Sequence, residues 1–372
     1  MVSVLELHKN GKLEIKSKYR INNKAILSKI YTPGVAEPCK KISRNKKKVY
    51  DYTIKSNTVA IITDGSAVLG LGDIGPEAAL PVMEGKAAIF REFADINAFP
   101  ICIKTKEINE IVDLIKKISP VFGAINLEDI AAPRCFELEE QLLKELDIPV
   151  FHDDQHGTAI VVLAGLINSL KVVNKRFRDI SIVISGAGAA GIAIARLLVL
   201  MVPKDIIVVD SKGIIHKGRK ENMNKAKRDI ASKTNKQQQK GGLRDAVKHK
   251  DVFIGVSKPN ILTQNMVRSM KKNPIIFAMS NPLPEIMPDK ALKAGAKVVA
   301  TGRSDFPNQV NNALVFPGIF KGLLRAKVKI NDRIKIKAAK ALAKIIKRPR
   351  PDKILPDIFN KNVVPTIAKC VK

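Results

Sequence analysis

The chain has 372 residues, 45% of them hydrophobic, and its 65 basic and 35 acidic side chains give a net charge of +30. This length allows two domains with separate cores, and this hydrophobic content excludes a disordered protein. No apolar stretch approaches the ~20 residues that cross a bilayer, no signal peptide opens the chain, and the four cysteines lack CxxC spacing, so we expect a cytoplasmic protein with reduced thiols and no membrane partner.

Short β-rich runs alternate with helical patterns over the first half of the chain. The predicted strands are 57–63, 99–105, 122–129 and 148–153, and the predicted helices between them are 108–120 and 135–147. This strand-helix alternation is typical of an α/β layer.

Two side chains early in the chain have both a chemical and an ordinary interpretation. Tyr31 precedes a proline-glycine turn in YTPGVAEPC, and Lys86 lies among apolar residues in ALPVMEGKAAIFREF. Burial could lower the pKa of Lys86 into the range of a general base. A turn tyrosine and a lysine with a buried aliphatic stem are the ordinary alternatives, because most lysines do no chemistry.

The stretch FHDDQHGTA at 151–159 raises the question of a metal. His152 and His156 have the spacing of a zinc-protease helix, but His152 ends a predicted strand and Gly157 follows His156 directly, which argues against that motif. The carboxylates fit better, because Glu128-Asp129 and Asp153-Asp154 both end predicted strands, and such ends converge in an α/β sheet. Together they would suit Mg²⁺ or Mn²⁺, although exposed turns or helix caps would explain each doublet equally well.

After an apolar helix at 158–173, which could join two domains, the pattern restarts with a dinucleotide-binding signature. Residues 179–200 read as a buried strand, a GAGAAG turn and a helix, and the next strand ends in Asp210. In this context the glycines permit a tight turn, close approach of the pyrophosphate and packing of helix on strand, while Asp210 would bind the ribose hydroxyls. The residues predicted to contact the dinucleotide are Gly186, Ala187, Gly188, Ala189, Ala190, Gly191 and Asp210.

The identity of the dinucleotide is less clear from the residues. An acidic residue at the end of the second strand is typical of NAD, because a carboxylate repels the 2′-phosphate of NADP. Lys212, Lys217, Arg219 and Lys220 follow closely, however, and could neutralise an additional phosphate. NAD is therefore the predicted cofactor, and NADP is the alternative.

The remainder of the chain is predicted to complete this second sheet and to end in a basic helix. The polar stretch 232–242 is predicted to be an exposed loop or a frayed helix end, and the runs 252–259 and 275–285 are predicted strands. Residues 321–350 hold twelve basic side chains against Asp332 alone, with apolar residues at helical spacing. A solvated helix face and a nucleic-acid surface are both compatible with this pattern, but the chain has no Trp and only four Tyr, so nucleic acid is not expected as a partner.

Taken together and in this order, the motifs resemble the malic enzymes of the short prokaryotic type over nearly the whole chain. The resemblance implies an α/β protein with an N-terminal α/β domain for substrate and metal, residues 1–157, and a Rossmann-type domain with a doubly wound parallel sheet, residues 158–372. It also implies oxidative decarboxylation of (S)-malate to pyruvate and CO₂ with reduction of NAD(P)⁺. The segments that carry it are YTPGVAEPC, TDGSAVLGLGDIGPEAALPVMEGKAAIF, AINLEDIAAPRCFELE, FHDDQHGTAIVVLAGL, ISGAGAAGIAIA, MSNPLPE and ATGRSDFPNQVNNALVFPG.

The resemblance assigns a role to each candidate. Tyr31 is similar to the family's general acid and Lys86 to its general base. Glu128, Asp129 and Asp154 are similar to its divalent-metal ligands, and Asp153 to the residue behind them. Asn281 and Asn312 are similar to asparagines that hold malate, and Asn281 is also expected beside the cofactor. A homodimer is expected from the same source.

One departure concerns the substrate carboxylate. Long animal-type malic enzymes have an arginine in the stretch before GLGD, whereas this chain reads DGSAVLGLGD, with Ser66 and no arginine. Ser66 is therefore the candidate in that stretch. Two alternative functions are a related 2-hydroxy acid decarboxylase without net cofactor turnover and a basic nucleic-acid-binding protein on a Rossmann scaffold.

Overall fold

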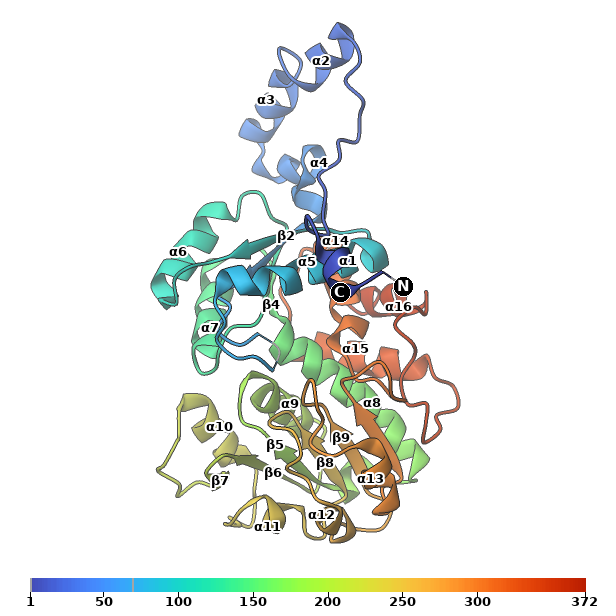
Figure 1. Ribbon diagram of the computed structural model, residues 1–372. Coiled ribbons are helices and arrows are strands. Elements are labelled where there is room, and N and C mark those ends of the chain that lie inside the picture. Colours follow the sequence, from blue (N-terminus) through green and yellow to red (C-terminus); the bar gives the residue numbers. More distant parts are fainter. Residues whose placement is uncertain (1, 69) are drawn as a thin grey trace.

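A computed structural model describes residues 2–68 and 70–372, and it shows an α/β protein with two sheets (Figure 1). The first sheet is parallel, with strand order β2-β1-β3-β4. Its strands are β1 (Thr58–Thr63), β2 (Asn97–Cys102), β3 (Ala124–Leu127) and β4 (Val150–His152). The four strands predicted in this half are confirmed, and β2 is shifted two residues toward the N-terminus.

Helices cover both faces of the first sheet. On β1, Val59 and Ile61 pack with α5 (Pro76–Ala94), whereas Ala60 and Ile62 face α6 (Ile108–Ile118) and α7 (Arg134–Glu145). Because successive strand residues point to opposite faces, a strand buried on both sides is apolar throughout. This explains the continuous run TVAIIT in the sequence.

The second sheet has the strand order β10-β9-β8-β5-β6-β7, and only β7 is antiparallel. Its strands are β5 (Ser181–Ser185), β6 (Asp205–Asp210), β7 (Gly213–Ile214), β8 (Val252–Gly255), β9 (Ile275–Ala278) and β10 (Val298–Thr301). The order reverses between β5 and β8, so a crevice is expected at their carboxyl ends. The prediction of a doubly wound parallel sheet is confirmed.

Two layers of helices enclose the second sheet. One face packs on α8 (Thr158–Val172) and α9 (Ala189–Val199), and α10 (Lys225–Lys233) contacts α9. The other face packs on α11 (Leu243–Val247), α12 (Gln264–Arg268) and α13 (Pro288–Lys293). The polar stretch 232–242 is the predicted end of a helix and mostly exposed loop. Thr234 and Asn235 are the exceptions and are buried, because the Asn235 backbone N–H donates to Ile206 O and its side chain to Ile215 O.

The C-terminal helices connect the two halves. In α14 (Phe316–Ala326), the rings of Phe316 and Phe320 lie 4.7 and 5.1 Å from the ring of Phe90 on α5. α15 (Asp332–Lys344) packs on α8, and α16 (Val363–Ala368) packs on α14. The chain therefore returns to the first sheet after completing the second.

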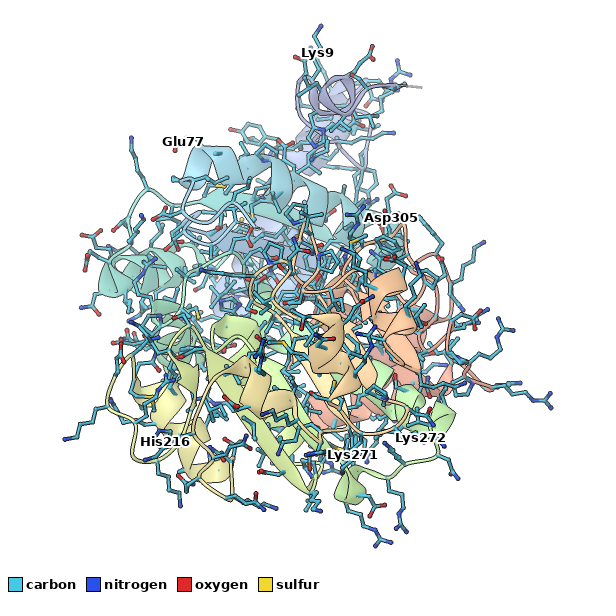
Figure 2. All side chains as sticks on the ribbon, turned by 60° about the horizontal axis from the view of Figure 1, so that its bottom comes forward. Lys9, Glu77, His216, Lys271, Lys272 and Asp305 are labelled. Atoms are coloured by element: carbon cyan, nitrogen blue, oxygen red, sulfur yellow. The ribbon has the colours of Figure 1, made fainter. Side chains whose placement is uncertain are left out.

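Positive side chains lie over the outside of the molecule. Figure 2 shows Lys9 at one end of the protein and Lys271 and Lys272 toward the opposite end. The predicted basic helix is confirmed as α15, which buries Ile334, Ala338 and Leu342 and leaves its lysines mostly exposed. Among the described residues, no helix combines the length and apolarity that a membrane crossing needs.

The N-terminal segment differs from the remainder in having no core of its own. Residues 19–48, which we call the N-terminal arm, contain α2 (Lys24–Ile30) and α3 (Ala36–Arg44), and these helices project from the body in Figure 1. No arm residue is buried. Its exposed apolar side chains are Tyr19, Ile21, Leu27, Ile30, Tyr31 and Val35.

Candidate active site

The two acidic doublets meet because they follow two neighbouring parallel strands. Leu127 at the end of β3 pairs in register with His152 at the end of β4. The next residues along each strand are Glu128 and Asp153, so the doublets leave the same edge of the sheet side by side. The convergence predicted from the sequence is confirmed by this pairing.

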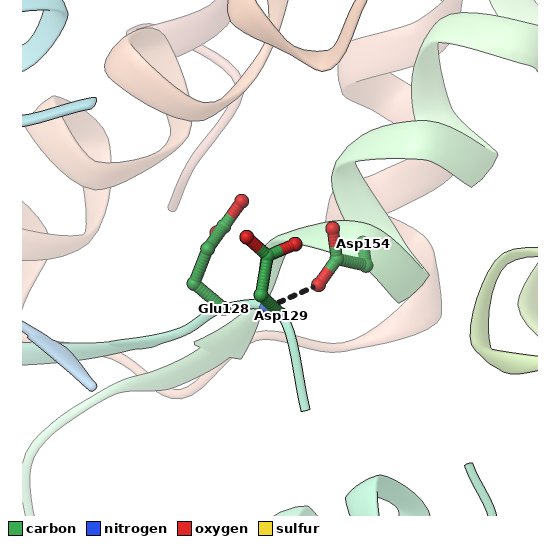
Figure 3. A group of neighbouring side chains, drawn as sticks. All are labelled: Glu128, Asp129 and Asp154. Carbon is green, nitrogen blue, oxygen red and sulfur yellow. Dashed lines mark hydrogen bonds between the residues drawn. The ribbon is translucent and has the colours of Figure 1, made fainter. Parts of the chain in front are cut away.

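Three of these carboxylates form a cluster suited to a cation. Ligand oxygens of Glu128, Asp129 and Asp154 lie within 4.8 Å of one another, and Figure 3 shows the three groups side by side. The Asp129 backbone N–H donates to Asp154 Oδ2 over 2.9 Å. The chain turns sharply at Asp129, the second residue after β3, where φ has the left-handed value of 52°. A set of carboxylate oxygens is the donor type that Mg²⁺ and Mn²⁺ prefer, so these residues fit such an ion.

Asp153 and Asp154 belong to a single wide helical turn. Residues Asp153–Gly157 form a π-helical turn that continues directly into α8. Such turns are rare and occur often at functional sites, because they present consecutive side chains at unusual angles. Here Asp154 belongs to the cluster of three carboxylates, while Asp153 contacts Lys86.

Lys86 joins this cluster from α5. Its Nζ lies 2.6 Å from Glu128 Oε2, donates to Asp153 Oδ2, and sits 4.4 Å from the centre of the Phe316 ring. Only 7% of Lys86 is exposed, and Asp153 is fully buried. The ammonium group is therefore enclosed between carboxylates and an aromatic face.

The ionisation of this cluster follows from burial and mutual charge. Burial alone would lower the pKa of Lys86, as the sequence suggested, but Asp153, Glu128 and Asp154 outweigh it and raise that pKa above its ordinary value. Burial raises the pKa of Glu128 to about 7 and the pKa values of Asp153 and Asp154 to about 6, with repulsion between the acids adding to it. Negative charge crowded around one lysine is relieved by a divalent cation.

Of the two histidine rings of the FHDDQHG stretch, only that of His156 has a hydrogen-bond partner among the described residues. His156 Nε2 donates to Glu139, 2.8 Å from Oε1, and His152 is fully buried. Burial lowers the pKa of His152 to about 4, so it is neutral at physiological pH. The interpretation that favoured the carboxylates over the histidine pair is supported.

Ser66 is placed near the cluster but its hydroxyl is fully used. It donates to Asp64 Oδ1 and accepts from the Ala131 backbone N–H and from Arg134 Nη2, each of the latter over 2.9 Å. A serine hydroxyl has one donor and two acceptor positions, so none remains for a ligand. Arg134, which also pairs with Asp64 over 2.7 Å, is a cation at this edge that the sequence interpretation missed. Its position five residues after Asp129 is the signal that could have revealed it.

Tyr31, the second proposed catalytic residue, lies away from the carboxylate cluster. It ends α2 on the N-terminal arm, and 68% of it is exposed. Lys86, by contrast, is buried in the body of the first domain. Within one chain these two residues are not brought together.

The glycine-rich turn after β5 has the features of a dinucleotide site. Gly186 has φ 116°, and a Cβ on it would lie 2.6 Å from Val256 O at the end of β8. A Cβ on Gly191 would lie 1.9 Å from Gly186 O, so both positions require glycine. A Cβ on Gly188 would meet nothing within 4 Å, which leaves the N-terminus of α9 open to a ligand. The small residues Ala187, Ala189 and Ala190 complete this turn.

Asp210 lies at the predicted end of β6 but is already saturated. Arg219 donates to both of its oxygens, Lys227 Nζ lies 2.8 Å from Oδ2, and the Lys212 backbone N–H donates to Oδ1. These hydrogen bonds outweigh the effect of burial and lower the pKa of Asp210. Asp210 was expected to bind the ribose hydroxyls, but its carboxylate has no acceptor position left for them in this structure.

The two asparagines lie where the two domains meet. A Cβ on Gly70, which belongs to the first domain, would lie 2.2 Å from Asn281 O, and a Cβ on Gly302 would lie 2.9 Å from Asn281 Nδ2. Asn312 lies close to Gly157, since a Cβ on Gly157 would lie 3.1 Å from Asn312 Cβ. Asn312 is thus next to the turn that carries Asp153 and Asp154.

Comparisons with known proteins agree with this arrangement. The family model described as "Malic enzyme, N-terminal domain" matches residues 10–143, and that described as "Malic enzyme, NAD binding domain" matches residues 155–371. The chain is 56% identical over 372 residues to the bifunctional malic/malolactic enzyme of Bacillus subtilis, covering 99% of this chain and 91% of the relative. It is 51% identical over 368 residues to the NAD-dependent malic enzyme of Geobacillus stearothermophilus, covering 98% and 77%.

Solved structures give the same result. The NAD-dependent malic enzyme of Thermotoga maritima superposes with a TM-score of 0.97 at 45% identity, covering 100% of this chain and 99% of that one. The malic enzyme of Pyrococcus horikoshii superposes with a TM-score of 0.95 at 47% identity, covering 99% and 88%. With matches to both family domains, close relatives and superposable structures, the chain belongs to the malic enzyme family, whose reaction is the oxidative decarboxylation of malate.

Proposed function

We propose that this chain converts (S)-malate to pyruvate and CO₂ with reduction of NAD(P)⁺ in a divalent-metal-dependent reaction. The observation that carries the proposal is the buried contact of Lys86 Nζ with Glu128 Oε2, 2.6 Å apart, beside the carboxylates of Asp129 and Asp154. A proton acceptor next to a cation-binding cluster suits the removal of a hydroxyl proton from a substrate held at the metal.

Lys86 would serve as the general base of this reaction. Glu128, Asp129 and Asp154 would hold Mg²⁺ or Mn²⁺, with Asp153 behind them. A bound cation supplies Lewis-acid polarisation of the 2-oxo acid, and NAD(P)⁺ supplies the hydride acceptor. Once positive charge balances the carboxylates, the pKa of Lys86 falls, and its neutral Nζ can accept the proton of the C2 hydroxyl.

Arg134 is a candidate for the substrate carboxylate. Malate carries two carboxylates, which a guanidinium group attracts by its charge. Arg134 Nη2 already donates to Asp64 and Ser66 and its Nη1 to Lys106 O, so a single additional hydrogen bond is expected rather than a parallel pair. Arg134 is partly exposed beside Ser66, whose hydroxyl helps to hold its guanidinium. Ser66 would then act by orienting Arg134, while Asn281 and Asn312 would donate to malate from the second domain.

Tyr31 would protonate C3 of the enolate after CO₂ departs, and it would do so in the site of a second copy of the chain. The N-terminal arm has no buried residue of its own and carries six large exposed apolar side chains, among them Tyr31 itself. Such a surface is covered when two copies exchange equivalent segments in a twofold dimer. A homodimer with exchanged arms therefore completes both sites.

The environment of Asp210 supports use of NADP⁺ as well as NAD⁺. Asp210 is paired with Arg219 and Lys227, so this corner carries more positive than negative charge. A neutralised carboxylate no longer repels a 2′-phosphate, and the two cations can attract it. NAD⁺ is bound without that interaction.

Two further assignments complete the proposal. The boundary between the malic domain and the dinucleotide-binding domain is taken at residues 157 and 158, where the π-helical turn passes into α8. A cytoplasmic setting is supported by the four free cysteines, since unpaired thiols are typical of reducing compartments.

An absorbance assay tests the function. Purified protein is supplied with malate and Mn²⁺ and either NAD⁺ or NADP⁺, with EDTA as the control, and reduced cofactor and pyruvate are measured together. Metal-dependent formation of both in equal amounts is the expected result. Failure of folded protein to turn over either cofactor would contradict the proposal.

A second activity is favoured by one relative. The Bacillus subtilis protein is named a bifunctional malic/malolactic enzyme, and it matches nearly the whole of this chain. A decarboxylation that regenerates its cofactor within the site would release lactate without net reduction of NAD⁺. Measurement of lactate against pyruvate in the same assay distinguishes the two outcomes.

A further inference from the structure

Glu139 is a buried carboxylate on α7 that the reaction described above does not use. Only 6% of Glu139 is exposed, and its buried neighbours on α7 are apolar core residues. In the sequence it belongs to the same helical face as Cys135, Leu138 and Leu142, all of which are buried. An acidic residue on such a face requires partners, because burying an unpaired charge is costly.

All three polar partners of Glu139 come from the segment that carries Asp153 and Asp154. The His152 backbone N–H donates to Oε1 over 3.3 Å, and Gln155 Nε2 donates to Oε2 over 3.2 Å. His156 Nε2 lies 2.8 Å from Oε1 and 3.0 Å from Oε2. One carboxylate thus contacts the residue before the two aspartates and both residues after them.

This pattern constrains the π-helical turn from both ends. A π turn lacks the tight packing of an α-helix, so its shape depends on contacts made outside it. Glu139 fixes His152 at the end of β4 and also fixes Gln155 and His156 within the turn. The only residues between these anchors are Asp153, which contacts Lys86, and Asp154, which belongs to the cation cluster.

The negative charge of Glu139 strengthens its hydrogen bonds to this segment. Although burial opposes it, the close contact with His156 lowers the pKa of Glu139 to about 2, so the carboxylate is ionised at physiological pH. Hydrogen bonds to an ionised acceptor are shorter and roughly twice as strong as neutral ones. The neutral amide of a glutamine would also present an N–H₂ group where two donors now converge.

We propose that Glu139 is a positioning residue of the metal site, which holds the His152–His156 segment so that Asp153 and Asp154 reach Lys86 and the cation. The inference rests on the proposed function, in which Asp154 is a metal ligand. Residues behind a metal's ligands commonly contribute about 10–100-fold to metal affinity. Glu139 contacts neither Lys86 nor the three carboxylates in any recorded hydrogen bond among the described residues, so its effect would be transmitted through the turn.

Binding of Mn²⁺ to the metal-free full chain, followed by electron paramagnetic resonance, tests the inference directly. Glu139→Gln should weaken the dissociation constant for Mn²⁺ by at least about tenfold. Binding of NAD⁺ should stay unchanged, and turnover should recover as Mn²⁺ is raised toward saturation. Glu140→Gln is the matched control, because Glu140 is the next residue of the same helix and, in the described part of the chain, its ion pairs are with surface Lys144 and Lys225.

Each outcome has a defined meaning. Equal Mn²⁺ affinity in Glu139→Gln and the unmodified chain would overturn the inference, while loss of Mn²⁺ binding in the unmodified chain would instead count against the proposed function. If Glu139→Gln loses its fold, judged by circular dichroism and NAD⁺ binding, His156→Ala replaces it, since His156 is less buried. That variant should also weaken Mn²⁺ binding several-fold, and an unchanged affinity would again overturn the inference.

Discussion

The buried charge cluster and the N-terminal arm place the two proposed catalytic side chains in opposite ways. Lys86 is 7% exposed and held by carboxylates from two neighbouring strand ends, so its position is set by one chain. Tyr31 is 68% exposed on a segment without a buried residue. The position of the proposed base is therefore set by the core of the first domain, whereas that of the proposed acid depends on what covers the arm.

The contrast teaches where rigidity comes from in this protein. The cluster lies on strand ends whose register is fixed by a core on both faces of the sheet. The arm has local helices and caps but few tertiary contacts, and short helices are marginal in water without packing. Replacing a residue in each of the two regions should thus have different consequences. Two further experiments test the charges of the cluster and those around Asp210.

The largest effect is expected from Lys86→Ala. Removing a general base commonly costs on the order of 10²–10⁴ in rate, and the variant also leaves a buried group of acids without its cation. Turnover of malate should fall below detection, while NAD⁺ binding measured by fluorescence should persist. Arg91→Ala on the same helix is the control, because Arg91 is exposed and pairs with exposed Asp95 and the side chain of Asn97. Full activity in Lys86→Ala would remove this residue from the mechanism.

Mixing two inactive variants tests the arm. Tyr31→Phe should lower turnover by roughly 100-fold or more, as the loss of a general acid does. If arms are exchanged, a dimer of Tyr31→Phe with Lys86→Ala has one intact site, so co-refolded mixtures should regain about a quarter of normal activity. Tyr19→Phe, which alters another exposed arm tyrosine, should remain active. No recovery in the mixture would mean that Tyr31 does not serve a partner's site.

Acidification should stabilise the metal-free chain. Glu128, with a pKa raised to about 7, and Asp153 and Asp154, with pKa values raised to about 6, bind protons in the folded chain that the unfolded chain binds only at lower pH. Their contribution is therefore complete below about pH 4 and is lost as pH rises through 6 to 7. His152, with its pKa lowered to about 4, acts in the opposite sense but is a single group.

Urea denaturation measures this dependence. In EDTA, the free energy of unfolding should rise by on the order of 2 kcal/mol between pH 7 and pH 5. Saturating Mg²⁺ should abolish the rise, because a cation keeps the carboxylates ionised. Glu128→Gln should reduce the rise in EDTA, and a chain that loses stability on acidification in EDTA would refute the assigned charge crowding.

The smallest effect concerns the second domain. Lys227→Gln removes one cation beside Asp210, so kcat/KM for NADP⁺ should fall roughly tenfold relative to NAD⁺, the size of one charge-assisted hydrogen bond. Lys225→Gln is a suitable control, because Lys225 is mostly exposed and pairs with Glu140. An unchanged ratio of the two cofactors would show that this corner does not select between them.

Several features could be predicted because they depend on local chemistry. Apolar runs such as TVAIIT mark strands buried on both faces, and Gly186 and Gly191 stand where a Cβ would collide with backbone. The acidic doublets could be expected to meet because both end neighbouring parallel strands. In each case the residue type and its place on an element are sufficient.

Other features could not be predicted, because they depend on which side chains the fold brings into contact. Burial suggested a lowered pKa for Lys86, but the carboxylates around it reverse the direction. Asp210 was expected to be free for ribose, whereas Arg219 and Lys227 saturate it. Arg134 and Ser66 form a network with Asp64 that no local pattern indicated.

The sequence by itself indicated the strand-helix alternation, the glycine-rich turn and the two acidic doublets at strand ends, since periodicity, glycine sterics and strand ends are local properties. Only the tertiary structure decided the charge state of Lys86, the pairing of Asp210, the contacts of Glu139 with the π-helical turn and the separation of Tyr31 from Lys86. Electrostatic interactions act through space and depend on burial, so they become defined only when distant segments are packed together.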